Sequence, residues 1–471
     1  MIGKIPVSLS LRVQLPQSLI QSLHGIKGFD QKAFEDIHAS GQQVTSIRLN
    51  PKKPISDFPH DHLSALTILP IPWTKHGFYL SGRPSFTFDP LFHAGTYYVQ
   101  EASSMFLEQA LMQTNDLSKP LRVLDLCAAP GGKSTHIQSL LSDDSLLVTN
   151  EVIRTRVNIL KDNIIKWGCS NVVVTNNDPK DFAKLEGYFD VIVVDAPCSG
   201  SGLFRREPEA MDEWSMDNVA LCSQRQQRIL ADAWPSLKNG GILIYSTCSY
   251  STEEDEQITD WVMNNFVVSS ERIDTDSSWN ITEVQGEKAA WGYRFWPDKL
   301  DGEGFFLACF RKMDGENTAE MKIKNKPTIV SKKDQPLLEK WVKPGDYFFL
   351  QHQQTVYAWP AKFQEEYNWL LNNLRVQYSG TILGELMRDK LVPDHSLAMA
   401  VMMNPDLPRL ELDYQQSIGY LQRKDLRLEN INTGWQLVMH HSHPLGWINA
   451  LPNRINNYYP KELRILKEKP E

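Results

Sequence analysis

The sequence lacks the patterns of several common protein classes. Its 471 residues include six cysteines but no C-x-x-C pair, which argues against a zinc site and against a disulfide framework. No run approaches the about 18 apolar residues that a membrane-spanning helix needs. The N-terminus shows no charged, apolar and small-residue signal sequence. We therefore expect a soluble, cytoplasmic protein that has no metal ion and no membrane partner.

Basic charge is also scarce. Lys and Arg number 49 against 57 Asp and Glu, which gives a formal net charge of -8. Indiscriminate binding to polyanions depends on neutralising phosphates with Lys and Arg, so the excess of acid argues against it. A nucleic-acid substrate would therefore need basic groups that are concentrated locally.

Apolar, β-rich runs alternate with helical patterns between residues 116 and 312. The runs are LRVLDL, LLVTNE, NVVVTNN, FDVIVVDA and GILIYST. This alternation predicts a parallel sheet covered by helices, which is an α/β, Rossmann-like fold. The continuously apolar stretches VIVV and ILIY are typical of central strands that are buried on both faces.

Three segments flank this predicted core. We expect residues 1–115 to form an N-terminal α+β domain with an RNA-binding or accessory role, and residues 337–471 to form a C-terminal extension. Between the core and the extension, residues 313–336 are polar and lysine-rich, which is typical of an interdomain linker. We expect the core to remain folded and to bind its cofactor when the extension is removed.

A loop of small residues follows the first predicted strand and precedes a helix. It consists of Cys127, Ala128, Ala129, Pro130, Gly131, Gly132 and Lys133. A phosphate-binding Walker loop requires glycine where this chain has Cys127, and Pro130 lacks an amide that would face phosphate. A dinucleotide fold requires G-x-G-x-x-G, which is absent. The third interpretation is a loop that binds S-adenosylmethionine, where small residues let the backbone approach the ligand.

Two acids at strand ends favour the third interpretation. Glu151 closes the second strand, where a carboxylate can accept from both ribose hydroxyls. Asp178 ends the third strand, in position to accept from the adenine amino group. Each acid alone could be a solvated strand-end residue, but the two together indicate a cofactor site.

Two cysteines follow the ends of the fourth and fifth strands. Cys198 lies in DAPCSG and Cys248 lies in STCS. Because the carboxyl ends of neighbouring parallel strands form one ligand-binding edge, both cysteines should face one pocket. Either cysteine alone could be a buried core residue. Together they suit nucleophilic addition to cytosine C6, which prepares C5 to take a methyl group, and Asp195 could hydrogen-bond the cytosine edge.

Such a nucleophile needs a feature that favours its thiolate form. A free thiol has a pKa of about 8.5 and is mostly protonated at neutrality. Ser251 and Glu254 have the spacing of a helix capping box. We therefore expect the positive end of a helix to lie near Cys248.

The motifs together resemble the RNA cytosine-C5 methyltransferases of the Nop2, Sun and Fmu family. The resemblance covers roughly residues 40–312 and includes SIRLNP, the G-x-x-x-x-Q-E-x-S-S stretch from Gly95 to Ser104, CAAPGGKS, DAPCSG, RREPE and STCS. It implies a class I methyltransferase fold with S-adenosyl-L-methionine as cofactor. It also implies that Cys248 is the nucleophile and that Cys198 promotes release of the adduct.

Within that family, the length of the C-terminal extension is similar to that of the F-type enzymes of the bacterial small ribosomal subunit. This similarity implies a cytosine in the decoding region of 16S rRNA as substrate, with ribosomal RNA or the assembled 30S subunit as partner. We also expect a monomer. Methylation of tRNA or 23S rRNA, and a non-catalytic role in ribosome assembly, remain alternatives.

The end of the chain resembles a PUA-like RNA-binding domain. From Tyr414 to Lys467, seven Lys or Arg stand against three acids. Four aromatic residues are interleaved with them: Trp435, Trp447, Tyr458 and Tyr459. We expect basic groups to track phosphates while the aromatic rings offer stacking faces, although such rings also pack the cores of small β-domains.

Overall fold

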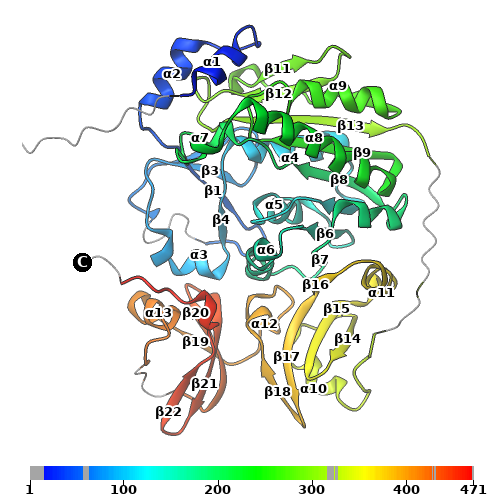
Figure 1. The fold of residues 1–471 in the computed structure, drawn as a ribbon. Coiled ribbons are helices and arrows are strands. Elements are labelled where there is room, and N and C mark those ends of the chain that lie inside the picture. The colour runs from blue at the N-terminus through cyan, green and yellow to red at the C-terminus, as the bar shows by residue number, and fades with distance from the viewer. Residues whose placement is uncertain are drawn as a thin grey trace, which may run out of the picture.

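The computed structural model describes residues 15–56, 63–315, 323, 327–426, 428 and 431–468. Most of the first half of the predicted linker, residues 316–322 and 324–326, lies outside these described residues. The described residues form one large central sheet, a smaller N-terminal sheet and two sheets in the C-terminal extension (Figure 1).

Five parallel strands form the middle of the central sheet, in the order β9-β8-β5-β6-β7. They are β5 (Arg122–Asp125), β6 (Leu146–Asn150), β7 (Val172–Thr175), β8 (Phe189–Asp195) and β9 (Leu237–Thr247). All five coincide with the apolar runs in the sequence, so the predicted α/β fold is confirmed. Every residue of β6 and β7 is buried, which explains why these runs do not alternate with polar residues.

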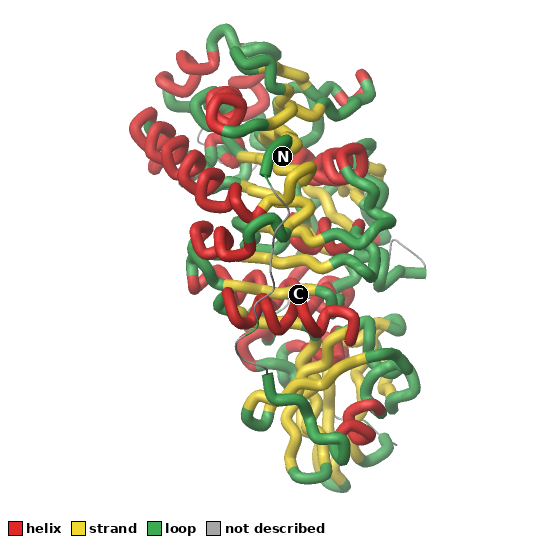
Figure 2. Tube along the Cα trace, turned by 90° about the vertical axis from the view of Figure 1, so that its right-hand side faces the viewer, coloured by secondary structure: helices red, strands yellow, loops and turns green. Residues whose placement is uncertain are grey.

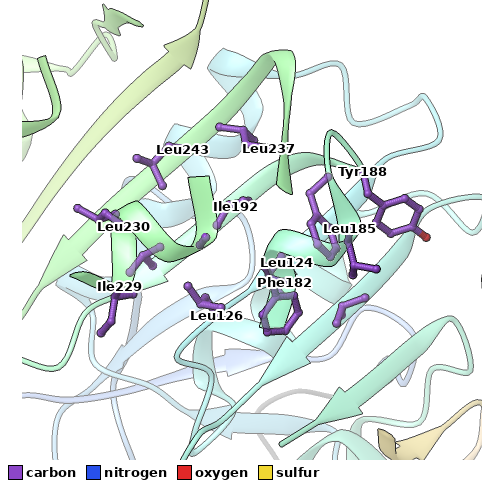
Figure 3. Close-up of a cluster of buried hydrophobic side chains, with 14 of the residues drawn as sticks. Leu124, Leu126, Phe182, Leu185, Tyr188, Ile192, Ile229, Leu230, Leu237 and Leu243 are labelled. Carbon is purple, nitrogen blue, oxygen red and sulfur yellow. The ribbon is translucent and has the colours of Figure 1, made fainter. Parts of the chain in front are cut away.

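Helices cover both faces of the sheet because successive strand residues point to opposite sides. The helices of this region are α4 (Leu107–Thr114), α5 (Gly132–Leu140), α6 (Arg154–Trp167), α7 (Ala210–Glu213), α8 (Met216–Ala233) and α9 (Glu256–Asn265). Leu124 packs with Ile229 and Leu230 of α8 (Figure 3), whereas Val123 packs with Leu160 of α6 on the opposite face. No described helix is both long enough and apolar enough to cross a membrane.

Antiparallel strands continue the sheet beyond β9. They are β10 (Val268–Glu271), β11 (Thr282–Gln285), β12 (Trp291–Phe295) and β13 (Phe305–Lys312). The pairing of β13 with β9 sets Phe306 opposite Thr247, the last residue of β9. The turn that precedes β13 therefore lies beside the segment that carries Cys248, where the Gly202 amide donates to the Cys248 carbonyl (2.8 Å) and the Gly304 amide donates to the Gly202 carbonyl (3.2 Å).

The N-terminal region combines helices with a four-stranded sheet, as predicted. Its elements are α1 (Gln17–Leu23), α2 (Gln31–Ala39), β1 (Thr45–Leu49), β2 (Ile68–Pro70), β3 (Gly77–Leu80), α3 (Pro90–Ala94) and β4 (Tyr97–Val99). The sheet order is β2-β3-β1-β4. Asn50 attaches it to the core, because the Asn50 side chain donates to the carbonyls of both Gly95 (2.9 Å) and Trp167 (3.0 Å).

The C-terminal extension contains two four-stranded sheets (Figure 1, yellow and red). The first consists of β14 (Tyr347–His352), β15 (Thr355–Pro360), β17 (Thr381–Met387) and β18 (Lys390–Pro393). The second consists of β19 (Arg409–Glu411), β20 (Gly434–His440), β21 (His443–Leu451) and β22 (Arg454–Asn457). The helices are α10 (Gln335–Glu339), α11 (Gln364–Asn373), α12 (His395–Met399) and α13 (Tyr414–Leu421).

One strand of the extension belongs to the central sheet. β16 (Val376–Ser379) pairs antiparallel with β7 and completes the edge of that sheet. The extension packs directly below the core in both views (Figures 1 and 2). The extension and the core therefore share one sheet, although the sequence divides them at residues 313–336. The composition of the sequence indicates the polar linker, but the four residues of β16 do not indicate which strand they pair with.

The aromatic residues of the tail divide into two classes. Trp447 is 1% exposed and Tyr459 is 2% exposed, so both are core residues and cannot stack on RNA. Tyr458 is 40% exposed, and its ring lies 4.5 Å from that of Trp435. The prediction of four stacking faces is thus corrected to one exposed tyrosine with a tryptophan beside it.

Gly95 provides a test of the contact between the N-terminal region and the core. Its φ is +72°, and an added Cβ would lie 2.1 Å from the Lys166 carbonyl oxygen. Gly41 has a similar φ of +67° with nothing within 4 Å of an added Cβ, so Gly41→Ala isolates the backbone strain. Overpacking costs about 1–3 kcal/mol. We expect Gly95→Ala to melt at least about 2 °C below Gly41→Ala in calorimetry. Equal Tm values would show that Lys166 moves away from the added Cβ without a measurable loss of stability.

Candidate active site

The predicted cofactor loop turns the chain from β5 into α5. Gly131 has a φ of +115°, a left-handed conformation that glycine adopts without a steric penalty. A Cβ added to Gly132 would lie 3.4 Å from the Tyr98 ring. The two glycines therefore let the loop turn sharply and pack close to β4. Burial and the neighbouring acids raise the pKa of Cys127, the first loop residue, which favours its thiol form.

Side chains of α6 hold the carbonyl groups of this loop. Arg156 donates to the Ala129 carbonyl (2.7 Å), and Asn163 donates to the Pro130 carbonyl (2.9 Å). Ala128 is fixed separately, because its amide donates to the Asn150 carbonyl at the end of β6 (2.8 Å). The shape of the loop is therefore set by contacts within the protein.

The two acids predicted to bind the cofactor differ in their surroundings. Glu151 is 3% exposed, and its Oε1 accepts from the Ile153 amide (2.8 Å). Because a carboxylate has about four lone-pair sites, acceptors remain for ribose hydroxyls. Asp178 caps a short 3-10 helix by accepting from the Lys180 amide (3.2 Å), and its Oδ2 lies 3.9 Å from Arg228.

A third acid, Asp125, also lies at this site, although no sequence motif marks it as a site residue. It ends β5 and is fully buried, and burial raises the pKa of its carboxyl to about 7. Its Oδ2 accepts from the Ser134 hydroxyl (2.6 Å), whereas Oδ1 has no partner among the described residues. A buried acceptor without a partner is costly unless a ligand supplies a donor. The ammonium group of S-adenosylmethionine is a donor of the required type, so the residues present fit this cofactor.

The two cysteines meet as the strand order predicts. β8 and β9 are parallel neighbours whose register pairs Asp195 with Ser246. The segments that follow these residues bring Cys198 Sγ to 3.0 Å from Cys248 Sγ. Two thiol groups therefore lie in hydrogen-bonding contact at the carboxyl edge of the sheet.

The neighbours of Cys198 shift its pKa. The hydrogen bond with Cys248, reinforced by burial, raises the pKa of Cys198 well above its ordinary value. The raised pKa favours the thiol form of Cys198, and either sulfur can be the donor in the contact between the two residues.

A partly buried cation lies near the cysteine pair. Lys133 Nζ is 2.7 Å from Asp195 Oδ2, and Asp195 Oδ1 accepts from the Ser246 hydroxyl (2.9 Å). Burial by itself lowers the pKa of Lys133, but the attraction of Asp195, with a contribution from Cys248, raises it above the ordinary value. Lys133, predicted to line the cofactor loop, thus points its ammonium group at the chemical site.

The predicted helix start near Cys248 is wrong. The chain makes turns before α9, whose first residue is Glu256 and whose N-cap residue, Asp255, makes no side-chain capping bond. Ser251 and Glu254 do not form a capping box. The positive charge that the structure brings near Cys248 is that of Lys133, and not the end of a helix.

Glu254 instead lies buried between the two cysteine loops. Its carboxylate accepts from the amide (2.8 Å) and the hydroxyl (2.5 Å) of Ser199, from the Ser249 hydroxyl (2.6 Å) and from the Gln226 amide (3.2 Å). Ser199 follows Cys198, and Ser249 follows Cys248. One carboxylate therefore joins the two segments that carry the thiols. Burial raises the pKa of Glu254, while these hydrogen bonds lower it.

A buried ion pair holds the other side of the Cys248 segment. Arg294 lies 3.1 Å from Asp255 and donates to the Tyr250 carbonyl (2.9 Å). Asp255 also accepts from the Thr247 hydroxyl (2.6 Å). Residues directly before and after Cys248 and Ser249 are thus fixed by one arginine and one aspartate.

Arg48 of the SIRLNP motif forms buried hydrogen bonds that connect β1 to α5. Arg48 is 1% exposed and donates to Gln100 (2.8 Å), to the Thr135 hydroxyl (2.7 Å) and to the Gly132 carbonyl (3.3 Å). It therefore ties β1 to the first turn of α5, which carries Lys133. Among the residues that the structure describes, no group of three or more His, Cys, Asp or Glu could hold a metal ion.

Family models match three successive parts of the chain. The N-terminal domain of 16S rRNA methyltransferase RsmF matches residues 15–102, and 16S rRNA methyltransferase RsmB/F matches residues 112–311. The RsmF PUA domain matches residues 407–465. The methyltransferase core and the PUA-like domain that the sequence predicts are confirmed.

Relatives named ribosomal RNA small subunit methyltransferase F are similar over most of the chain. The protein of Pectobacterium atrosepticum is 32% identical over 84% of this chain and 84% of its own. That of Psychromonas ingrahamii is 30% identical over 96% of this chain and 98% of its own.

Solved structures from Pyrococcus horikoshii share the fold over 64% of this chain. A methyltransferase homolog protein is 27% identical with a TM-score of 0.50, and the match covers 100% of that chain. NSun6, solved with the S-adenosylmethionine analogue SFG, is 20% identical with a TM-score of 0.53 over 99% of its chain.

Glu254 should set the approach of the two thiols. In Glu254→Ala, Ser199 and Ser249 lose a shared acceptor, at a cost of about 1–3 kcal/mol per unsatisfied buried group. We expect the loops to relax and diamide to convert the two thiols into a disulfide at least about fivefold more slowly than in the unmodified protein. Glu254→Gln has the same shape and can bond both serines, so it should stay within about twofold. Mass spectrometry of the Cys198 and Cys248 peptides follows the reaction. Equal rates in all three proteins would show that Glu254 does not set the approach of the two thiols.

Proposed function

We propose, from the premise that this chain belongs to the 16S rRNA methyltransferase F family, that it methylates C5 of a cytosine through a covalent adduct with Cys248. S-adenosylmethionine supplies the methyl group when bound. The observation that carries the proposal is the 3.0 Å contact between Cys198 and Cys248 beside the Lys133 cation. We place the target in the decoding region of 16S rRNA, as the F-type resemblance implies.

The first step is addition of the Cys248 thiolate to C6 of the cytosine. Cytosine C5 is a poor nucleophile until a thiolate adds to C6 and makes C5 enamine-like. We assign Cys198 the donor role in its 3.0 Å contact with Cys248. The positive charge of Lys133 also acts on Cys248, so both groups stabilise the thiolate before attack. The negative charge that attack moves onto the ring remains close to the same ammonium group.

The second step is collapse of the methylated adduct. C5 must lose its proton while the bond between C6 and Cys248 Sγ breaks, so a base is needed beside that sulfur. Once Cys248 is a thioether, the hydrogen bond that raises the pKa of Cys198 is gone, and Cys198 can release its proton to water. Cys198 then takes the C5 proton as Cys248 leaves as a thiolate. The cycle restores both side chains and releases one proton.

Three acids support the cofactor in this proposal. Glu151 accepts from the ribose hydroxyls and Asp178 accepts from the adenine amino group. Asp125 accepts from the ammonium group with Oδ1, which otherwise has no partner among the described residues. The small residues of the cofactor loop allow close approach of its backbone to the ligand.

The Cys198→Ala variant tests the division of roles. Addition and methylation remain possible, but collapse lacks its base, so the protein should accumulate as a covalent RNA complex. The measurement is denaturing electrophoresis with unmethylated 16S rRNA, offered both as naked RNA and as 30S subunits, with and without RNase.

Three controls sharpen the assignment. Cys198→Ala with Cys248→Ala should form no complex, and Cys169→Ala should behave like the unmodified protein because Cys169 lies outside the site. Accumulation of the complex in Cys248→Ala instead would reverse the two roles. Cofactor binding without methyl transfer to 16S rRNA, tRNA or 23S rRNA would favour an assembly factor.

Glu151→Ala should weaken cofactor binding. Loss of a charged acceptor for the ribose hydroxyls costs about 1.5–3 kcal/mol, which corresponds to a rise in Kd of about 10- to 150-fold. Glu151→Gln keeps an acceptor for the Ile153 amide and should lose less. Isothermal titration with S-adenosylmethionine measures both variants, and an unchanged Kd in Glu151→Ala excludes the ribose contact.

A further inference from the structure

The C-terminal extension reaches the cofactor site through one strand. β16 lies along the outer edge of β7, and the pairing continues past β7, where the Asn176 amide donates to the Arg375 carbonyl (3.0 Å). β7 leads directly to Asp178, the residue proposed to accept from adenine. The extension therefore contacts the chain two residues before that acid.

Asn177 connects this contact to the cofactor loop through hydrogen bonds. The Arg375 backbone amide donates to Asn177 Oδ1 (2.9 Å). The Asn177 amide donates to Asn150 Oδ1 (2.9 Å), and the Asn177 carbonyl accepts from Asn150 Nδ2 (3.0 Å). Asn150 holds the start of the loop: its side-chain Nδ2 donates to the Leu126 carbonyl (3.1 Å), and its backbone carbonyl accepts from the Ala128 amide (2.8 Å). Three residues thus link the extension to the loop.

The extension is attached to the core on both sides of β16. Before β16, Glu366 forms an ion pair with Arg122, and the Trp369 ring lies 4.7 Å from that of Tyr188. After β16, the Val401 amide donates to the Gly168 carbonyl at the end of α6 (2.9 Å). These contacts fix β16 against β7 from two directions.

We propose that β16 is a structural part of the cofactor site and that the backbone amide of Arg375 is a positioning group for it. The proposal rests on the S-adenosylmethionine site proposed above. Asn177 is 3% exposed, so a side-chain oxygen that loses its donor finds no water and must turn. That movement disturbs both the approach to Asp178 and the Asn150 contacts of the loop. The segment that bears the PUA domain thereby also shapes the cofactor site.

A matched pair of variants isolates the Arg375 amide. Arg375→Pro removes the donor, whereas Arg375→Ala keeps the donor and removes only an exposed side chain. In calorimetric titrations of the full chain with S-adenosylmethionine, Arg375→Pro should raise Kd about three- to tenfold and Arg375→Ala less than about twofold. At saturating cofactor, kcat and the KM for RNA should remain near those of the unmodified protein in both.

A double-mutant cycle identifies the path. Asn177→Ala removes the same hydrogen bond from its other partner and should raise Kd by at least as much, and adding Arg375→Pro to it should cause little further loss. If Arg375→Pro lowers the Tm of the ligand-free protein too far for titration, the Kd of Asn177→Ala tests the proposal by itself. Equal Kd values for Arg375→Pro and Arg375→Ala, additive effects, or an unchanged Kd in Asn177→Ala would each overturn the proposal. Absence of cofactor binding by the unmodified protein would overturn the proposed function as well, which separates the two failures.

Discussion

The carboxylate of Glu254 is the constraint on which the arrangement of the two thiols depends. Parallel pairing of β8 and β9 brings two segments to one edge of the sheet, but it does not fix the turns that follow the strands. Glu254 does so, because Ser199 and Ser249 share it as an acceptor. It is fully buried, so neither serine can replace that bond with one to water. The distance between Cys198 and Cys248 follows from this shared acceptor.

Much of the catalytic core could be predicted because strand ends carry their own chemical signals. The five apolar runs predicted the five parallel strands, and the proximity of Cys198 to Cys248 followed from the strand order. Contacts made by turns could not be predicted. Ser251 and Glu254 have the local spacing of a cap, but the Glu254 carboxylate instead accepts from Ser249 and from Ser199, which lies 55 residues earlier in the sequence. The direction of the Lys133 side chain could not be predicted either, because the composition of the loop does not indicate that Lys133 contacts Asp195. The pairing of β16 with β7 also could not be predicted, because the sequence of β16 does not indicate its partner strand.

Several basic side chains serve the interior rather than the surface. Arg48, Lys53, Arg205, Arg294 and Lys312 are all less than a tenth exposed. Arg48 and Arg294 hold loops of the site by multidentate hydrogen bonds, the geometry for which a planar guanidinium is suited. A chain with a net charge of -8 therefore has fewer cations for phosphate than its composition suggests. Contact with RNA must depend on small local groups of basic residues.

The edge pairing of β16 has a consequence for synthesis of the protein. A nascent chain can assemble β5 to β9 as soon as these strands leave the ribosome, but the partner of the β7 edge is encoded about 200 residues after β7. At about 5–20 residues per second, that edge stays unpaired for about 10–40 s. An open apolar edge is a template for pairing with other chains. Completion of the sheet therefore waits for translation of the C-terminal extension, and premature termination before residue 376 leaves an edge prone to aggregation.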